Sequence, residues 1–307
     1  MQSPIHEHVP ALAGQSLRIL IWDRDLIDMW CLDASGARLP YRGRGSTWHC
    51  HPELELTLIT RGEGILCVGD HIGRFTAPDC LLLGPHLPHV WRADGAMAGI
   101  SLQIDVDVHA AGGLGTLPEL ADLSRLWSAA GRGVRWHAAT ASTLLRLAAS
   151  LETLPALARM GVFLTMLAAM QTARADEALP LSQTVLGTAG PGPSAAAMER
   201  VVDHVMTHYR EDLSLADMVV MSGTSPATFH RHFVRMTGKT FVAYLQALRI
   251  QEVRRALTDP RRNITDIAFA AGFNNLSHFH SIFRKFVGST PRAFRRSLAT
   301  DQPLPPL

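Results

Sequence analysis

One pattern occurs twice between residues 213 and 296, and it constrains the fold of this 307-residue chain more than any other feature. The stretch from Ser214 to Val219 (SLADMV) recurs as Asn263 to Ala268 (NITDIA), 49 residues later. The second copy then contains one additional residue, so the run from Phe229 to Thr240 corresponds to the run from Phe279 to Thr290 at a spacing of 50. A repeat at this spacing indicates one supersecondary unit present in two copies.

Each copy of the pattern predicts two helices joined by a glycine turn. Ser214 and Asn263 are helix-capping residue types that precede short runs with apolar residues at helical spacing. Gly223 and Gly272 follow these runs at equivalent positions, and glycine readily adopts the backbone conformations of tight turns. The second helix of each copy is predicted over about residues 226–236 and 276–287. A capping residue type precedes each of them, Ser225 (followed by Pro226) and Asn275.

Each predicted second helix has an apolar face and an opposite face that is polar or basic. In the first copy, Phe229, Phe233 and Met236 share a face when successive residues turn by about 100°. Small polar and basic side chains, as on the opposite face, are those with which a helix enters the major groove of DNA. The residues predicted to contact DNA are Ala227, Thr228, His230, Arg231, Arg235, Ser277, His278, Ser281, Arg284 and Lys285. Arg231 is the predicted base-reading residue, since arginine to guanine is the commonest specific contact.

The segment from Phe241 to Leu257 separates the two copies and contains neither Pro nor Gly. As one helix it spans roughly 25 Å, which lets two recognition helices reach successive major grooves, about 34 Å apart, on one face of DNA. An ordinary helical bundle with an accidental repeat is the alternative. Against it, Lys and Arg outnumber Asp and Glu by 15 to 8 over residues 194–300, whereas acidic residues exceed basic ones by 18 to 14 over residues 1–193. This asymmetry indicates that nucleic acid binds at one end of the chain only.

Several short segments of the C-terminal third carry a family resemblance: Leu213–Leu215, Ser225–Phe233, Thr237–Phe241, Leu248–Ile250, Ile267–Phe273, Phe283–Lys285, Gly288–Pro291 and Phe294–Arg295. Together they resemble the DNA-binding domain of the AraC/XylS transcriptional regulators. The resemblance implies a bacterial, cytoplasmic transcription factor that binds double-stranded DNA, contacts RNA polymerase, responds to a small-molecule effector and can form a homodimer. One position departs from the pattern, because relatives with a similar Asn-Leu-Ser segment often carry Arg where this chain has Ser281. That difference suggests another base preference, or weaker base reading by the second copy.

Residues 1–110 contain short apolar runs separated by Gly, Pro and Asp, which predict the closely spaced strands of a sandwich or barrel. The predicted strands are Leu17–Trp22, Leu54–Thr60, Gly64–Val68, His71–Phe75, Cys80–Leu83, Val90–Arg92 and Ala98–Ile104. All four cysteines lie in this region without a CxxC pair, so reduced thiols in a cytoplasmic protein are expected. Neither a signal peptide nor a membrane span is expected from the apolar runs.

A set of histidines and a carboxylate lies within this region. His49, His51 and Glu55, with Gly43 and Gly62 on either side, have the spacing of the first cupin motif, which the segment resembles. On an unbroken strand these three polar side chains would face the same side, because side chains alternate along a strand. The sequence therefore predicts that they point together into the barrel.

The segment Gly84–His89 resembles the second cupin motif in a shortened form, with Ala93 where an Asn is usual. His89 would complete a set of three imidazoles and the Glu55 carboxylate. Such a set suits a divalent transition metal such as iron, manganese, nickel or zinc. Two alternatives remain open: the set binds a small molecule directly, or its members pair with one another. Glu53 is predicted to be structural or to face the ligand.

Residues 111–178 are predicted to form a helical connector. Apolar residues recur at helical spacing over Leu117–Ala130, Trp136–Glu152 and Pro155–Ala175. The leucine stripes of these helices either bury against the same chain or form a dimer surface. Residues 179–194 are rich in Gly and Pro and are predicted to be a flexible linker. The double helix-turn-helix domain is predicted over residues 195–300.

We therefore predict an α+β multidomain chain: an N-terminal cupin-like β-barrel that senses an effector, a helical connector, and a C-terminal all-α domain with two helix-turn-helix motifs. The predicted function is regulation of transcription without enzymatic activity, in which effector binding favours one arrangement of the DNA-binding domains. The alternative is a cupin metalloenzyme with an appended helical domain. The histidine set supports that alternative, whereas the shortened second motif and the duplicated domain do not.

Overall fold

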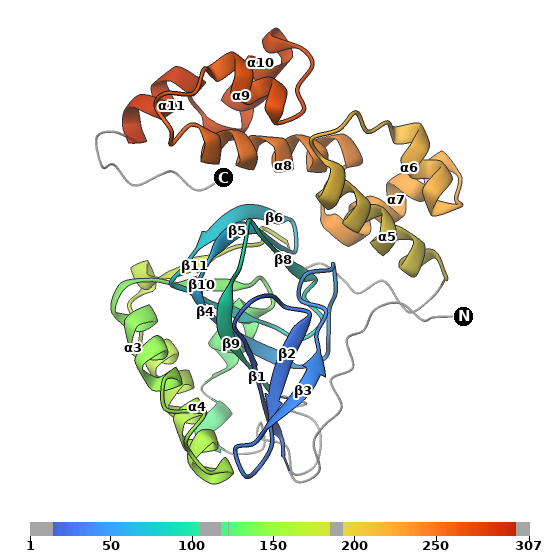
Figure 1. Cartoon of the computed structure of the whole chain (residues 1–307). Coiled ribbons are helices and arrows are strands. Elements are labelled where there is room, and N and C mark those ends of the chain that lie inside the picture. Colours follow the sequence, from blue (N-terminus) through green and yellow to red (C-terminus); the bar gives the residue numbers. More distant parts are fainter. Residues whose placement is uncertain (1–14, 105–117, 122, 185–192, 299–307) are drawn as a thin grey trace. The chain divides into compact units, whose positions relative to one another are not determined.

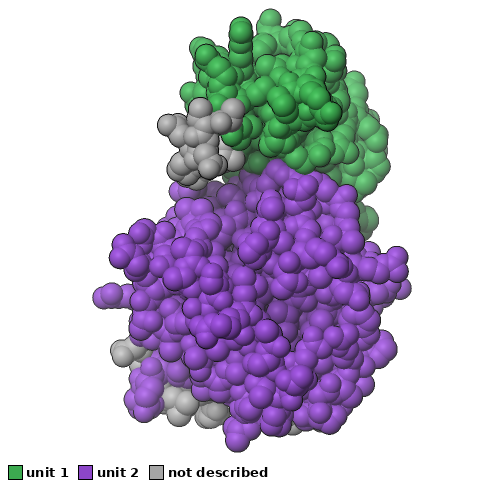
Figure 2. Space-filling view, turned by 60° about the vertical axis from the view of Figure 1, so that its left-hand side comes forward, with its two compact units in different colours: residues 1–4, 189–307 green, residues 5–188 purple. Residues whose placement is uncertain are grey.

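The computed structural model describes residues 15–104, 118–121, 123–184 and 193–298. The chain divides into two compact units, one of residues 5–188 and one of residues 189–307 together with residues 1–4 (Figure 2). No helix of the described segments combines the length and the apolar character that crossing a membrane requires.

Two antiparallel sheets form the first unit (Figure 1). The larger sheet has the strand order β11-β10-β7-β4-β9-β1-β2-β3, and the smaller sheet has the order β6-β5-β8. The strands are β1 (Leu17–Trp22), β2 (Asp28–Leu32), β3 (Arg38–Arg42), β4 (Leu54–Arg61), β5 (Glu63–Val68), β6 (His71–Thr76), β7 (Asp79–Leu83), β8 (His89–Ala93), β9 (Ala98–Ile104), β10 (Val134–Trp136) and β11 (Ala178–Pro180). All seven predicted strands are present, and β1 and β9 have the predicted limits.

Alternation along the central strands separates two buried faces. Leu56 and Leu58 of β4 belong to the core formed with Phe163 and Leu167 of α4 (Ala156–Gln171). The intervening Thr57, together with Glu55 two residues earlier, points to the opposite face, between the two sheets. Because helices cover one face and the smaller sheet the other, these strands are buried along most of their length. The other helices of this unit are α1 (Pro118–Ala121), α2 (Ser124–Ala130) and α3 (Ala138–Ala148), with a 3₁₀ turn at Ala175–Glu177.

The predicted connector over residues 111–178 is wrong as a separate domain within the described residues. Its segments at 134–136 and 178–180 are β10 and β11, which extend the larger sheet beside β7. Leu144 and Leu151, from the predicted stripes, are fully buried in the core of this unit. The stripes therefore pack against the same chain, because the outer face of the sheet requires a cover.

The second unit is helical within the described residues (Figure 1): α5 (Pro193–His208), α6 (Leu215–Ser222), α7 (Pro226–Thr237), α8 (Phe241–Ala256), α9 (Ile264–Ala270), α10 (Leu276–Val287) and α11 (Pro291–Leu298). Both copies of the repeat form the predicted helix, turn and helix. The predicted capping side chains accept backbone N–H groups of the first turn at Ser214, Ser225, Asn263 and Asn275. Gly223 and Gly272 have φ values of 63° and 93°, a region that favours glycine.

The helix α8 is the predicted spacer, and both copies pack on it. Near its start, Tyr244 packs against Phe233 of α7 with ring centroids 5.6 Å apart. Near its end, Ile250 and Val253 lie in one buried cluster with Phe279 of α10. The two second helices of the repeat are therefore fixed to opposite ends of one continuous helix.

Candidate functional site

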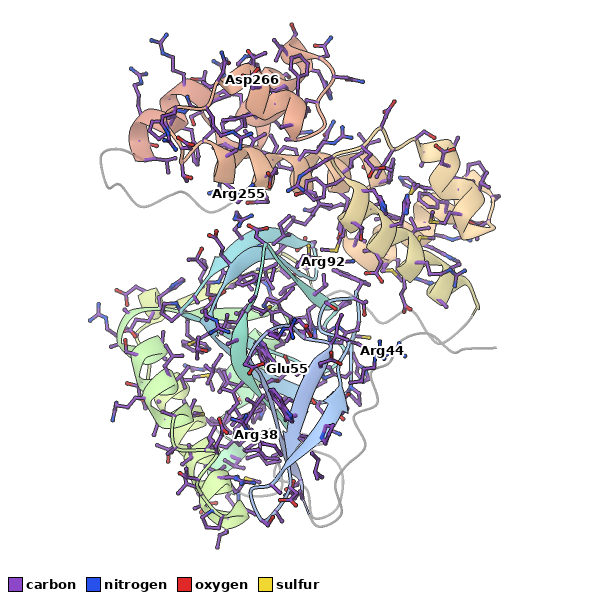
Figure 3. All side chains as sticks on the ribbon, in the orientation of Figure 1. Arg38, Arg44, Glu55, Arg92, Arg255 and Asp266 are labelled. Carbon is purple, nitrogen blue, oxygen red and sulfur yellow. The ribbon has the colours of Figure 1, made fainter. Side chains whose placement is uncertain are left out.

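The inner faces of β1, β9 and β4 carry polar residues in register. Arg18 lies opposite Gln103, and Gln103 lies opposite Glu55. In the next inward row, Ser101 of β9 lies opposite Thr57 of β4. Glu55 points into the interior of the first unit, whereas Arg38 lies on β3, at the edge of the larger sheet (Figure 3). Polar side chains on inward-facing positions of otherwise apolar strands thus mark one region of the interior.

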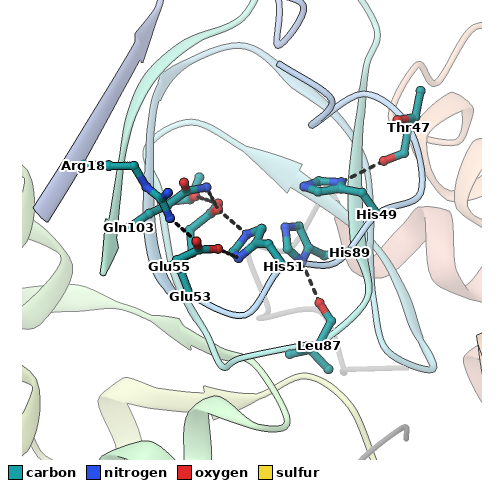
Figure 4. A network of polar contacts seen from close by, with 10 residues as sticks. Arg18, Thr47, His49, His51, Glu53, Glu55, Leu87, His89 and Gln103 are labelled. Carbon is teal, nitrogen blue, oxygen red and sulfur yellow. Dashed lines mark hydrogen bonds and ion pairs between the residues drawn. The ribbon is translucent and has the colours of Figure 1, made fainter. Parts of the chain in front are cut away.

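The three predicted histidine ligands meet in this region (Figure 4). One ring nitrogen from each of His49, His51 and His89 lies within 4.8 Å of the other two, and all three side chains are buried. His89 is the first residue of β8, and its backbone exchanges two hydrogen bonds with that of His49. His49 and His51 do not share an unbroken strand with Glu55, because β4 begins only at Leu54, as predicted. A bridge to β8, rather than strand alternation, places His49 beside the others.

Backbone carbonyls orient two of the three rings. His49 Nδ1 lies 2.9 Å from the Thr47 carbonyl oxygen, and His89 Nδ1 lies 2.7 Å from that of Leu87. A carbonyl oxygen only accepts, so each Nδ1 carries a proton, and the neutral ring of His89 then presents a lone pair at Nε2. His89 Nε2 is buried and has no hydrogen-bond partner among the described residues. A histidine that binds a metal through one ring nitrogen usually donates a hydrogen bond from the other, as His89 does.

His51 occupies a different position, between two carboxylates. Its Nε2 lies 2.9 Å from Glu55 Oε2, and its Nδ1 lies 3.3 Å from Glu53 Oε2. Arg18 forms a buried ion pair with Glu53 on the other side. Glu55 also accepts a hydrogen bond of 2.7 Å from Gln103 Nε2 and one from the Thr57 hydroxyl. Positive and negative groups therefore alternate through the network, which lets all of them stay charged while buried.

These contacts shift the pKa values in opposite directions. Burial opposes the charged form of His51, but contacts with Glu53 and Glu55 outweigh burial and raise its pKa from 6.5 to about 10. Burial would raise the pKa of Glu53, but His51 and Arg18 lower it from 4.5 to about 2. The pKa of Glu55 is also lowered, because the contacts with His51 outweigh burial. Burial and the neighbouring His49 depress the pKa of His89 well below 6.5, so its ring is neutral at physiological pH.

A small cavity adjoins the cluster. It is lined by Leu20, Trp22, Leu26, Met29, Gly45, His49, Glu55, Thr57, Trp91, Ser101 and Gln103. Its volume of about 20 Å³ is enough for one or two water molecules, each of which needs roughly 10 to 15 Å³. Ser101 Oγ and Gln103 Oε1 are buried here without hydrogen-bond partners among the described residues. The space suits an ion or water molecules, which would satisfy these polar atoms.

Sequence reasoning did not identify Arg18, Thr57, Ser101 or Gln103 as site residues. The available signal was a polar residue at an inward position of an apolar run, as in LRILIW for β1 and AGISLQI for β9. Which strands lie side by side decides whether such residues meet, and the sequence alone does not determine that. Glu53 was predicted to be structural or to face the ligand, and the structure places it in the ion-pair network.

The residues predicted to contact DNA lie on α7 and α10, on the faces that do not enter the core. Nine of the ten are exposed, and Thr228 is half-buried. The apolar faces of both helices are buried through Phe229, Phe233, Phe279 and Phe283. The Nε2 atom of His278 also lies 3.3 Å from the Nε2 atom of Gln246 in α8. The structure thus separates a buried face from a polar and basic face in each copy.

Comparison with known proteins matches both parts of the chain. The family model of the AraC-like ligand binding domain matches residues 32–104, and that of a helix-turn-helix domain matches residues 215–297. The HTH-type transcriptional activator RhaS of Pectobacterium atrosepticum is 30% identical over 115 residues, which are 38% of this chain and 41% of that protein. The bifunctional transcriptional activator/DNA repair enzyme AdaA of Bacillus subtilis is 29% identical over 104 residues, 34% of this chain and 49% of that protein. The matches span less than half the length of these relatives.

Solved structures are similar to parts of the chain. An AraC-type transcriptional regulator from Chromobacterium violaceum is 28% identical, with a TM-score of 0.32, and the match covers 36% of this chain and 97% of that one. The DNA-binding domain of AdpA in complex with a target DNA is 24% identical, with a TM-score of 0.33, and the match covers 35% and 96%. With an AraC-like ligand binding domain followed by a helix-turn-helix domain, the chain belongs to the AraC/XylS family of transcriptional regulators.

Proposed function

We propose that the chain binds specific DNA sequences through α7 and α10 and regulates transcription in response to an effector bound in the barrel. The observation that carries this proposal is the exposed polar and basic face present on both helices of the repeat. Packing in the core accounts for the apolar, buried face of each helix. It does not account for the basic residues on the exposed face. Because α8 holds both copies, the two helices suit successive major grooves.

In this proposal Arg231 reads a base, and the other basic residues hold phosphates. Arg231 is exposed in the middle of α7, and a guanidinium donates two hydrogen bonds to guanine in the major groove. Arg235 and Lys285 occupy equivalent positions in the last turn of each helix, where phosphate contacts position the helix without reading sequence. Transcriptional activation would also require contact with RNA polymerase, and a second copy of the chain is the other protein partner that we propose.

Binding-site selection from a random duplex library tests this proposal. The full-length protein should select a common sequence, and Arg231→Ala should lose preference at one or two positions of it. Arg261→Ala is the matched control, because Arg261 lies in the turn between α8 and α9, outside both second helices. Failure of the unaltered protein to bind any duplex at low salt would refute the proposal. An equal loss of affinity for all sequences in Arg231→Ala would make Arg231 a phosphate contact instead.

We also propose that the effector site holds a divalent transition metal, with His49, His51, His89 and Glu55 as ligands. Three observations support the fit: the converging ring nitrogens, the partnerless Nε2 of His89, and the ion-sized cavity. His51 Nε2 forms a hydrogen bond of 2.9 Å with Glu55 Oε2. Metal binding at this nitrogen would release its proton, so the metal should bind more tightly at higher pH. The metal would serve as a Lewis acid that attracts oxygen donors to the cavity.

Metal content of the purified, chelator-washed and zinc-reloaded protein tests the second proposal. Near-stoichiometric zinc is expected in the unaltered protein and should be lost in His49→Ala and His89→Ala. The control His137→Ala removes an exposed histidine before α3 and should leave zinc content unchanged. Equal zinc in all four proteins, or none in any, would refute this site.

The alternative of a metalloenzyme finds less support in the barrel. A substrate must lie next to the metal, and a cavity of about 20 Å³ leaves space for an ion or for water only. We therefore propose a sensing role for the barrel rather than catalysis. Turnover of a candidate substrate by the zinc-loaded protein, abolished in His51→Ala, would establish the alternative.

A further inference from the structure

The hairpin between β5 and β6 holds the last residues of the first unit that the structure describes. Asp70 at its tip is only 9% exposed. Its Oδ1 accepts a hydrogen bond of 2.8 Å from the Ser182 hydroxyl and another of 2.8 Å from the Gln183 backbone N–H. Its Oδ2 lies 3.4 Å from the Thr184 hydroxyl. One buried carboxylate therefore binds three consecutive residues at the point where the chain leaves this unit for the helical one.

The same hairpin is bonded to the strand of the histidine cluster. Val68 is the cross-strand partner of His89, and the Gly69 N–H donates to the Pro88 carbonyl at 2.8 Å. A Cβ at Gly69 would lie 2.6 Å from Ser182 Oγ and 3.4 Å from Leu87. The backbone of Gly69 thus fills the space between residues next to His89 and residues 182–184, with no room for a side chain.

A second contact runs through apolar side chains. Leu87, whose carbonyl oxygen orients the His89 ring at 2.7 Å, is buried in one cluster with Leu181. On the other side, Ser182 exchanges backbone and side-chain hydrogen bonds of 2.8 Å with Arg132. Residues 181–184 are therefore held between the turn at Arg132 and the β5–β6 hairpin at Gly69 and Asp70. A shift of β8 would therefore be transmitted to residues 181–184 through both hydrogen bonds and packing.

We propose that Gly69 and Asp70 couple occupancy of the barrel site to residues 182–184, and so transmit the effector signal toward the DNA-binding unit. This coupling rests on the proposed function, in which His89 contacts the effector. A bond to His89 Nε2 fixes the ring, the ring fixes the Leu87 carbonyl, and the adjoining Pro88 carbonyl positions Gly69. Asp70 is then a positioning residue, since it holds residues 182–184 without touching the effector. An effector that binds one arrangement more tightly shifts the population toward it.

Hydrogen exchange of the full-length protein, followed by mass spectrometry of peptides that cover residues 181–184, tests the coupling. The probe is zinc chloride, with metal content measured on the same samples. Asp70→Ala should speed exchange of the Gln183 amide about tenfold, since the amide loses a charge-assisted hydrogen bond. Asp94→Ala is the matched control, because Asp94 directly follows β8 of the same small sheet but pairs with Arg74. Zinc should slow Gln183 exchange in the unaltered protein and in Asp94→Ala, but not in Asp70→Ala.

A second perturbation makes the test independent of metal and of DNA. His89→Ala removes the bond to the Leu87 carbonyl, so it should speed Gln183 exchange when Asp70 is present and add nothing in the Asp70→Ala background. Additive effects of the two substitutions would overturn the coupling. So would unchanged exchange at Gln183 in a protein that binds zinc. Absence of zinc binding would refute only the metal site, and absence of DNA binding only the proposed function, because the exchange readout needs neither.

Discussion

The barrel interior and the exposed faces of α7 and α10 use the same residue types in opposite settings. In the barrel, Arg18 and Glu53 are each 6% exposed, and every charge in the network faces a countercharge. On the two helices, Arg231 and Arg284 are exposed and pair with no acidic residue in the described ion pairs. Water solvates the exposed groups, so they stay available to a partner. The buried groups depend on one another, because losing one leaves a charge that water does not reach.

The largest effect should follow from breaking the buried ion pair. Glu53→Ala leaves the Arg18 guanidinium buried without its carboxylate, which typically costs roughly 3 to 5 kcal/mol. All six tryptophans lie in the first unit, so urea unfolding followed by tryptophan fluorescence reports the stability of this unit alone. Glu152→Ala is the control, because Glu152 pairs with Arg38 at the surface, where both are more than 40% exposed. That change should cost about 1 kcal/mol or less, and equal costs would contradict the comparison.

A pH dependence should distinguish the network from the exposed charges. The folded-state pKa of His51 is raised from 6.5 to about 10, so its contribution to stability is complete below pH 6.5 and is lost as the pH rises toward 10. The folded-state pKa of Glu53 is lowered from 4.5 to about 2, so its contribution is present above pH 4.5 and is lost as the pH falls toward 2. Both contributions are complete between pH 4.5 and pH 6.5, so the metal-free barrel should be most stable in that range.

Urea midpoints of the chelator-treated protein between pH 5 and 10 measure this dependence. His51→Gln is expected to lower stability at every pH, so the two proteins are compared by the slope of stability against pH rather than by absolute stability. The unaltered barrel should lose stability above pH 6.5, and His51→Gln should remove most of that loss. A steep alkaline loss that persists in His51→Gln would assign the titration to another group.

The same contrast explains which parts of the molecule could be predicted from sequence. The helices of the repeat depend on local signals, such as Ser225 followed by Pro226 and the glycine at position 223, and their caps form as predicted. The strand β3 was missed because its residues are mostly exposed at a sheet edge. The strands β10 and β11 were missed because they contain three residues each and depend on distant pairing: β10 pairs with β7, more than 50 residues earlier, and β11 pairs with β10.

The histidine cluster was predicted for the right residues by an argument that was partly wrong. Spacing selected His49, His51 and Glu55, but the bridge to β8 places His49 in the cluster. The partners Arg18 and Gln103 come from strands whose neighbours only the folded chain determines. Residue types at a site can thus be read from a sequence, whereas the network that sets their charge states depends on tertiary pairing.

A smaller effect should separate the two copies of the repeat. Arg231 of α7 corresponds to Ser281 of α10, and both are exposed. Arg231→Ala should cost about 1 to 3 kcal/mol of discrimination at one base pair, whereas Ser281→Ala should cost less because serine reaches fewer base atoms. Binding to a set of single-base variants of the selected sequence measures both. Ser281→Arg should add discrimination in the second half of the site, and equal losses from both alanine variants would mean that the copies read DNA alike.

The smallest effect concerns the basic residues in the last turns. The second copy has two of them, Arg284 and Lys285, whereas the first has Arg235 beside the apolar Val234. Each lost phosphate contact should lower the slope of log affinity against log salt by about one unit and weaken all sequences alike. Replacing both Arg284 and Lys285 by alanine should therefore lower the slope about twice as much as Arg235→Ala. That outcome would mean that the first copy supplies more of the base reading and the second more of the phosphate binding. A loss of sequence preference without a change in slope would instead assign these residues to base contacts.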